Sequence, residues 1–492
     1  MKYHLVTLGC QMNKSDSERV SSVVEKMGFQ FTENEDEANL VGILACSVRQ
    51  KAIDKVYSKI HRWNKQKNKR NLITFVSGCI LPSDQEKFLK LFDMVFSMNE
   101  LPLFPQMLSQ YGVVTPYRVE NDFEPEEEKI TILPGKVKLE LSGVSFHPNQ
   151  TQHKTGQALI IKKPEENMKE FWDVKPNYGS SFEAFIPIQN GCDKFCTFCA
   201  VPYTRGREVS RPSEEILTEV KDLVSQGYKT ITLLGQNVNS YGLDKKGEEI
   251  SFPELLRKIG QFGESNSHIF WVYFTSPHPR DMTDEVIEVI AQYSCLAKQI
   301  HLPLQSGDDK VLIRMNRKHS LNDYRKIIHS IRRLIPQATI FTDIIVGFTS
   351  ESDEQFENTV KAMDEFKFNM AYIARYSPRP GAASSRWDDD VNHEIKKNRL
   401  QILSEHLQQH SLEYNQHILG KVLTVLVVKK DRKPGYLSAL TEGKIIVRIS
   451  SNDDALIGQF IQVKITSIRS LSTEGEVLES VELPNINQLI NQ

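Results

Sequence analysis

The chain has 492 residues, of which 39% are hydrophobic and 25% are charged, the composition of an ordinary globular protein. At roughly 150 residues per domain, this length suggests about three domains. The formal net charge is −2, which excludes attraction of nucleic acid by a global positive field, so any such partner must meet local basic patches. Without an export signal or a run of about 18 apolar residues, we expect a cytoplasmic monomer with no membrane partner and reduced cysteines.

In residues 1–115, three apolar runs are each followed directly by a cysteine. The runs Tyr3–Gly9, Leu40–Ala45 and Leu72–Gly78 precede Cys10, Cys46 and Cys79. A helical pattern follows each cysteine, which predicts a parallel α/β sheet with crossover helices. Because the carboxyl ends of parallel strands share one edge, we expect the three thiols to converge on one metal centre. The alternative is three separate buried cysteines, each common in protein cores.

The first domain also contains a basic run. Lys51–Arg70 holds eight Lys or Arg and one acidic residue. The run is either a solvated helix face or a patch that contacts phosphates, and the sequence leaves both open.

Residues 116–177 are predicted to be a linker with an inserted β-element. Glu120–Lys129 is acidic, and Ile130–Leu141 alternates apolar and polar residues in the manner of a strand or hairpin. No residue in this stretch indicates a chemical role.

Residues 178–410 alternate strand and helix patterns, and we expect a partial (β/α)6 barrel. The predicted strands are Phe182–Ile188, Thr230–Leu234, Ile269–Phe274, Gln299–Leu304, Thr339–Val346 and Met370–Tyr376. In barrels the chemistry lies on loops after the strands' carboxyl ends. Polar residues follow several of these strands and are predicted to form one rim: Gln236, Asn237, Gln305 and Asp343.

The loop after the first of these strands holds three cysteines within eight residues, Cys192, Cys196 and Cys199, in a C-x3-C-x2-C spacing. Iron–sulfur clusters usually take four thiolates, so three would leave one iron open, as catalytic metal sites require. A zinc knuckle or three reduced core cysteines are the alternatives. Zinc would need a fourth Cys or His nearby, and His278 lies far downstream in the sequence.

Residues 411–483 contain five short strand patterns separated by turn signals, which predict a small β-barrel. Such barrels often bind oligonucleotides. Lys429, Lys430, Arg432 and Lys433 are predicted to form a basic loop that contacts RNA phosphates. The alternative is a barrel that serves stability or dimerisation.

The sequence resembles a known family over nearly its whole length. The matching segments are Gly9-Cys10-Gln11-Met12-Asn13, Ser47-Val48-Arg49, Val201-Pro202-Tyr203-Thr204-Arg205-Gly206, Leu234-Gly235-Gln236-Asn237-Val238-Asn239 and His301-Leu302-Pro303-Leu304-Gln305-Ser306-Gly307. With the two cysteine trios, they resemble the methylthiotransferases, a branch of the radical S-adenosylmethionine (SAM) enzymes. In that branch a three-cysteine domain, a radical SAM core and a C-terminal TRAM domain follow one another. Leu44-Ala45 and Ala382 depart from the family pattern.

The resemblance implies two [4Fe–4S] clusters and SAM as cofactors. The cluster at Cys192, Cys196 and Cys199 would reduce SAM to give a 5′-deoxyadenosyl radical, and the cluster at Cys10, Cys46 and Cys79 would carry the sulfur. The implied product is a methylthio group at C2 of an N6-isopentenylated adenosine beside the tRNA anticodon. The residues implied to contact SAM, or to lie on the polar rim of the core beside it, are Phe198, Gln236, Asn237, Gln305 and Asp343. An electron-donor protein and a sulfur source are the further implied partners.

Three other functions stay open at this stage. Two are related methylthiotransferases, acting on threonylcarbamoyl-adenosine in tRNA or on a ribosomal-protein aspartate. The latter type has Pro-Lys after its first cysteine, where this chain has Gln11-Met12. The third is a non-catalytic iron–sulfur RNA-binding protein, against which two complete cysteine trios argue.

Overall fold

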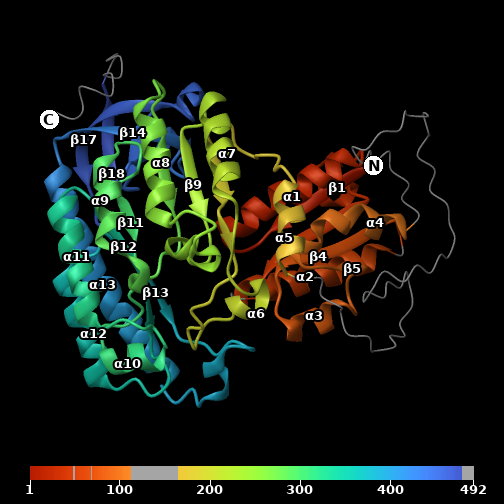
Figure 1. Ribbon diagram of the computed structural model, residues 1–492, viewed down its shortest axis with the longest axis horizontal. Coiled ribbons are helices and arrows are strands. Elements are labelled where there is room, and N and C mark those ends of the chain that lie inside the picture. The colour runs from red at the N-terminus through yellow and green to blue at the C-terminus, as the bar shows by residue number, and fades with distance from the viewer. Residues whose placement is uncertain (48–49, 68, 112–163, 479–492) are drawn as a thin grey trace. The chain divides into compact units, whose positions relative to one another are not determined.

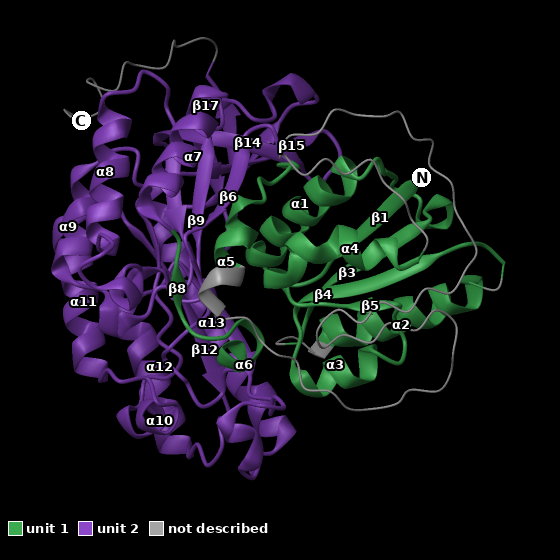
Figure 2. Ribbon diagram, turned by 45° about the vertical axis from the view of Figure 1, so that its right-hand side comes forward, with its two compact units in different colours: residues 1–179, 200–211 green, residues 180–199, 212–492 purple. Residues whose placement is uncertain are grey.

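The structure is a computed structural model in which residues 1–47, 50–67, 69–111 and 164–478 are described (Figure 1). The chain divides into two compact units (Figure 2). Unit 1 consists of residues 1–179 and 200–211, and unit 2 of residues 180–199 and 212–492. The strand or hairpin predicted at Ile130–Leu141 lies outside the described residues. Among the described helices, none combines the length and apolar character that crossing a membrane requires.

Unit 1 is built on a five-stranded parallel sheet with the order β2-β1-β3-β4-β5. The strands are β1 (Lys2–Thr7), β2 (Gln30–Phe31), β3 (Leu40–Cys46), β4 (Ile73–Cys79) and β5 (Met94–Val95). The parallel sheet and its three long strands confirm the prediction. The strands β2 and β5 have two residues each and are too short to give a recognisable pattern.

Helices cover both faces of this sheet. On one face, α1 (Gln11–Lys26) and α5 (Pro164–Asp173) share a core with Leu40 and Leu44 of β3. On the other, α2 (Gln50–Lys67) packs on Val41 and Ile43, because successive strand residues point to opposite faces. The shorter helices of unit 1 are η1 (Glu35–Glu37), α3 (Pro82–Phe88), η2 (Met98–Leu103), α4 (Phe104–Ser109) and α6 (Val201–Arg205).

The strand order of unit 1 reverses between β1 and β3. The connections leave these two neighbouring strands toward opposite faces, through α1 and α2 respectively. In open α/β sheets, such a reversal leaves a crevice at the carboxyl ends of the strands, where ligands bind. The sequence of unit 1 therefore builds its ligand edge at the residues that follow β1, β3 and β4.

The core of unit 2 contains six parallel strands in two three-stranded sheets, β10-β9-β6 and β11-β12-β13. The strands are β6 (Glu183–Pro187), β9 (Thr230–Leu234), β10 (Trp271–Phe274), β11 (Gln299–His301), β12 (Thr339–Val346) and β13 (Met370–Arg375). Backbone hydrogen bonds from Val272 N to Cys295 O (2.7 Å) and from Ala297 N to Val272 O (3.0 Å) connect the sheets. All six predicted strands are confirmed, in the arrangement of an open barrel.

The connecting helices of this core are α7 (Ser213–Ser225), η3 (Val238–Ser240), η4 (Leu243–Lys245), α8 (Phe252–Glu264), η5 (Pro279–Asp281), α9 (Asp284–Gln292), α10 (Asp309–Arg314), α11 (Leu321–Leu334), α12 (Asp353–Phe366) and η6 (Ala383–Arg386). Two short strands remain, β7 (Gln189–Asn190) in unit 2 and β8 (Val209–Ser210) in unit 1. The long helix α13 (His393–Ile418) leads out of the core.

The C-terminal region forms a closed barrel with the strand order β14-β15-β16-β18-β17. Its elements are β14 (Val422–Lys430), β15 (Tyr436–Thr441), β16 (Ile446–Ser450), η7 (Asp454–Leu456), β17 (Phe460–Ile468) and β18 (Thr473–Val477). The five predicted strands are confirmed. The basic loop is shorter than predicted, because Lys429 and Lys430 continue the pairing of β14 with β15 and only Arg432 and Lys433 lie in the turn.

The barrel packs on the amino ends of the core strands. Phe460 lies edge-on to Trp271 with ring centroids 4.6 Å apart. The turn between β15 and β16 accepts hydrogen bonds from the core: Tyr273 Oη to Glu442 O (3.0 Å), Lys298 N to Glu442 Oε1 (3.0 Å) and Thr339 Oγ1 to Gly443 O (2.7 Å). The barrel is therefore part of the fold of unit 2, and it leaves the carboxyl ends of the same strands to the site.

The contact between Phe460 and Trp271 gives the first prediction. Phe460→Ala should lower the free energy of unfolding by about 3 kcal/mol, because it opens a cavity in the buried core between barrel and sheet. Val422→Ala is the matched control, since Val422 lies in the same barrel with 50% of its surface exposed and should cost less than about 0.5 kcal/mol. Chemical denaturation under anaerobic conditions measures both. Equal losses of unfolding free energy in the two variants would contradict the proposed packing of the barrel on the core.

Candidate functional site

The structure brings the first cysteine trio together at the ligand edge of unit 1. Cys46 and Cys79 are directly opposite one another in the register of β3 and β4, and both are buried. Cys10 follows β1 and occupies the N-cap position of α1. The intervening Gly9 has φ +124°, and a Cβ there would lie 2.8 Å from Cys46 Cβ. Glycine is required here because the first loop passes directly against the second cysteine.

Asn13 holds the strand ends on which these cysteines lie. Its Nδ2 donates to the carbonyl oxygens of Leu8 and Ala45, each at 2.7 Å, and its Oδ1 lies 3.7 Å from Cys79 Sγ. The side chain is fully buried. The sequence contained Asn13 within a family motif but indicated no role for it, because one acceptor follows β1 and the other lies in β3, far away in the sequence.

A buried ion pair lies against the third thiol of this trio. Arg205 Nε is 3.0 Å from Cys79 Sγ, and Arg205 Nη2 is 2.5 Å from Asp16 Oδ2. Burial raises the pKa of the Cys79 thiol to about 12, against the opposing charge of Arg205. Burial disfavours the charge of the guanidinium, but Asp16 and Cys79 raise the pKa of Arg205 above its usual value. The site thus offers three sulfur ligands and a fixed positive charge.

The second trio lies in unit 2, on the loop that follows β6 and β7. The end of α10 holds this loop: Thr197 N donates to Met315 O (3.1 Å), and Thr197 Oγ1 donates to Arg314 O (2.8 Å). Asn316 Nδ2 donates to Phe195 O at 2.9 Å. Phe195 itself has φ +50°, a conformation that side chains rarely adopt, which marks a tight loop. Cys192 is buried, while Cys196 and Cys199 are half-buried.

A second arginine contacts this trio. Arg317 is buried; its Nη1 lies 3.5 Å from Cys196 Sγ and its Nη2 donates to Pro303 O at 2.8 Å. The sequence did not indicate Arg317, since no local motif connects it with a cysteine more than a hundred positions earlier.

Of the two residues after β9 that are predicted to bind cofactor, Gln236 contacts the cysteine loop directly and Asn237 is connected to it through Asp281. Gln236 Oε1 accepts the Gly191 backbone N–H at 2.5 Å. Asn237 Nδ2 donates to Asp281 Oδ2 (3.1 Å), and the same carboxylate oxygen pairs with Lys194 Nζ (2.5 Å). These contacts fix the start of the loop from the carboxyl end of β9.

The remaining predicted residues lie around the same strands. Phe198 packs against an apolar cluster made of Val311, Met315, Phe348 and Tyr376. Gln305, with φ +74°, donates its N–H to Asp343 O (2.8 Å) beside β12. The Asp343 carboxylate is 2.7 Å from His301 Nε2. The half-exposed Asp343 and His301 therefore form a polar pair next to β11 and β12.

His278, which lies downstream of the loop in the sequence, is buried as a neutral ring. Its Nδ1 accepts the Arg280 backbone N–H at 3.1 Å, so Nε2 carries the proton. Burial, followed by the positive charges of Arg317 and other neighbours, lowers the pKa of His278 far below its usual range. In this tautomer neither nitrogen offers a lone pair to zinc, which disfavours the zinc alternative.

Four of the eight basic residues of the run Lys51–Arg70 have partners within their own unit. Lys59 and Arg62 form ion pairs with Glu35, and Lys67 pairs with Asp93 at 2.6 Å. Arg70 donates to backbone carbonyls, among them Glu35 O at 2.9 Å. These contacts favour the reading as a structural helix face over a phosphate patch.

The basic residues of the C-terminal barrel differ in their pairing. Lys430 pairs with Asp454 (2.6 Å), and Lys433 lies over the Tyr436 ring with its Nζ 3.8 Å from Glu474. For Lys429 and Arg432, both exposed, no ion pair is found within the part of the chain that the structure describes. These two are the charges most available to a phosphate.

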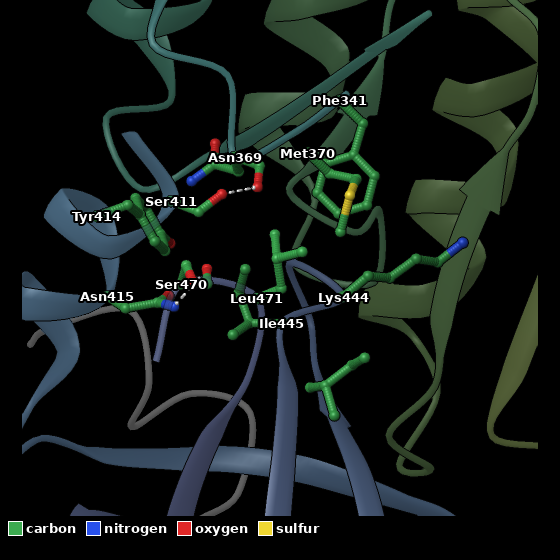
Figure 3. A pocket seen from close by; sticks show the side chains of 11 residues that line it. Phe341, Asn369, Met370, Ser411, Tyr414, Asn415, Lys444, Ile445, Ser470 and Leu471 are labelled. Carbon is green, nitrogen blue, oxygen red and sulfur yellow. Dashed lines mark hydrogen bonds between the residues drawn. The ribbon is translucent and has the colours of Figure 1, made fainter. Parts of the chain in front are cut away.

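A pocket of unit 2 lies between α13, the core strands and the barrel (Figure 3). Its lining includes Phe341, Asn369, Met370, Ser411, Tyr414, Asn415, Lys444, Ile445, Ser470 and Leu471. Ser411 Oγ donates to the backbone carbonyl of Asn369. Asn415 Nδ2 donates to the backbone carbonyls of Arg469 and Ser470. None of the predicted cofactor residues lines this pocket, so it is a packing gap rather than the site.

Three family descriptions match this sequence: the Radical SAM superfamily over residues 186–363, the Uncharacterized protein family UPF0004 over residues 2–98, and the TRAM domain over residues 417–478. Several proteins named tRNA-2-methylthio-N(6)-dimethylallyladenosine synthase are similar over full length. The protein from Dictyoglomus thermophilum is 37% identical, covering 98% of this chain and 100% of its own. Those from Thermoanaerobacter pseudethanolicus and Yersinia enterocolitica are 34% and 35% identical, each covering 97% of this chain and 93% of their own.

Proposed function

Because this chain belongs to the tRNA-2-methylthio-N(6)-dimethylallyladenosine synthase family of radical SAM enzymes, we propose that it inserts a methylthio group at C2 of N6-isopentenyladenosine beside the tRNA anticodon. The observation that carries the proposal is the full-length similarity combined with two cysteine trios, each at the carboxyl edge of a parallel sheet. Bases in single-stranded loops are those that proteins can reach and read in RNA.

Membership of the radical SAM family implies SAM and one [4Fe–4S] cluster at Cys192, Cys196 and Cys199. The proposal adds a second [4Fe–4S] cluster at Cys10, Cys46 and Cys79. Three thiols suit iron–sulfur binding, and Arg205 Nε–H already points at the Cys79 sulfur. When bound, these groups supply one-electron reduction of SAM and the sulfur that is transferred.

The protein's own residues position the reaction. Gln236 and the Lys194–Asp281 pair hold the cysteine loop, and Arg317 places positive charge beside Cys196. The polar pair of Asp343 and His301 provides half-exposed hydrogen-bonding groups on the side where β11 and β12 carry it. We assign the adenine edge to this side, because exocyclic and ring nitrogens of a base need such partners.

The proposed partners follow from the same chemistry. tRNA is the substrate, and the C-terminal barrel, whose sequence matches the TRAM domain, is the proposed tRNA-binding surface. A reductant protein and a sulfur source complete the reaction. The alternatives that modify threonylcarbamoyl-adenosine or a ribosomal-protein aspartate have less support, because the similar proteins are named for dimethylallyladenosine.

The direct test of the proposed function is mass spectrometry of nucleosides after anaerobic incubation with SAM, a reductant and defined tRNA. tRNA bearing N6-isopentenyladenosine should gain the methylthio group, whereas tRNA with unmodified or threonylcarbamoylated adenosine should not. Cys192→Ala should abolish the product with every tRNA. Methylthiolation of the threonylcarbamoylated tRNA alone would assign the chain to the other tRNA-modifying type.

The barrel's role in tRNA binding is tested by two double variants of equal charge. Lys429→Gln with Arg432→Gln should weaken tRNA binding and reduce its salt dependence by a slope of about one to two, because each lost phosphate contact releases fewer counterions. Lys430→Gln with Lys433→Gln should have the smaller effect, since carboxylates already neutralise these lysines.

Fluorescence titration with labelled tRNA at several salt concentrations measures both pairs. SAM cleavage without tRNA should be unchanged in all four substitutions, because the barrel packs at the opposite ends of the core strands. Wild-type affinity for tRNA in the Lys429/Arg432 variant would exclude this part of the barrel as the tRNA-binding surface.

A further inference from the structure

Arg205 has surroundings that a surface arginine does not need. Its side chain is 3% exposed, and the Asp16 carboxylate that pairs with it is fully buried. Two directions of its planar guanidinium are used: Nη2 contacts Asp16 at 2.5 Å and Asn13 Oδ1 at 3.3 Å, while Nε points to Cys79 Sγ at 3.0 Å. A buried ion pair contributes little net stability, so its retention calls for another reason.

We propose that Arg205 is a positioning residue for the cluster at Cys10, Cys46 and Cys79, which holds the Cys79 sulfur and sets the reduction potential of that cluster. This inference rests on the second cluster of the proposed function. Hydrogen bonds to cysteine sulfurs and nearby positive charge stabilise the reduced, more negative form of an iron–sulfur cluster. Asp16 and Asn13 fix the guanidinium, so that Nε–H is directed at the sulfur before any cluster is bound.

The geometry requires arginine rather than lysine. A lysine ammonium is a single point charge, whereas the guanidinium presents donors in two fixed directions at once. Only such a fork can satisfy the Asp16 carboxylate and the Cys79 sulfur from one side chain. Gly206, with φ +78°, ends α6 directly after Arg205 and fixes the point at which the arginine leaves the helix.

Arg205 lies close in sequence to the other cysteine trio. It lies six positions after Cys199, the last cysteine of the radical SAM trio. Residues 200–211, which carry it, pack as part of unit 1, although residues 180–199 and 212–492 belong to unit 2. Within the short stretch Cys199–Arg205, the chain therefore passes from a proposed ligand of one cluster, in unit 2, to the donor for the other cluster, in unit 1.

The test uses full-length protein in which Cys192, Cys196 and Cys199 are changed to alanine, so that only the proposed second cluster is present. Redox titration followed by electron paramagnetic resonance gives its midpoint potential, and a chelator gives its rate of iron loss. Arg205→Gln should shift the midpoint to more negative potential and accelerate iron loss about 10–100-fold, the usual cost of removing a partner of a metal ligand. Arg205→Lys should recover only part of the shift. Arg207→Gln, an exposed neighbour in the same segment, should change neither value.

A merely structural role is separated by removing both buried charges. Arg205→Gln alone leaves the Asp16 carboxylate buried without its cation, which can destabilise the fold. Asp16→Asn combined with Arg205→Gln removes that penalty, so the fold should recover while the midpoint stays shifted, because the N–H···S contact is still absent. Recovery of the wild-type midpoint in the double variant would overturn the inference.

The protein with all six cysteines provides the last readout. Arg205→Gln should lower methylthio product at least about tenfold while 5′-deoxyadenosine release without tRNA stays within twofold of wild type. An unchanged midpoint and product yield would overturn the inference and leave the proposed function intact. Absence of any iron in the triple-alanine parent would instead refute the second cluster itself, and the role of Arg205 with it.

Discussion

The carboxyl edge of a parallel sheet is the constraint on which both sites depend. In unit 1, the reversal of strand order between β1 and β3 places three loops at one edge, and each loop brings one cysteine. In unit 2, the loop with the second trio follows the first core strand, and residues after β9 and α10 hold it. Because the C-terminal barrel closes the amino ends of the core strands, its addition leaves this edge accessible.

Charge is the second element shared by the two sites. Each trio has one buried arginine within hydrogen-bonding reach of a sulfur, Arg205 at Cys79 and Arg317 at Cys196. Buried thiolates are costly without compensation, and a fixed guanidinium supplies it. The two arginines are held differently: Arg205 by a buried carboxylate, and Arg317 by a backbone carbonyl. In the first arrangement a carboxylate balances the charge of the guanidinium, whereas in the second a neutral carbonyl accepts its hydrogen bond.

Much of this architecture could be predicted because local patterns of apolar and polar residues in the sequence indicate it. The apolar runs before Cys10, Cys46 and Cys79 predicted both the strands and the convergence of the thiols, and the six core strands and the closed barrel followed from the same kind of signal. What the sequence did not show depends on contacts between distant positions. Asn13 acts on carbonyls of two strands, and Arg205 meets Asp16 only after the fold is made. Lys429 and Lys430 were predicted in a loop because charge suggested exposure, yet an exposed strand also accommodates charge.

The central claim is that the protein holds two separate clusters, and iron analysis after anaerobic reconstitution tests it most directly. The intact chain should bind about eight irons, and changing Cys10, Cys46 and Cys79 together to alanine should leave about four. That variant should still release 5′-deoxyadenosine from SAM but form no methylthio product. If it retains the full iron content of the intact chain, or if the intact chain holds only about four irons, the account of the first trio is contradicted.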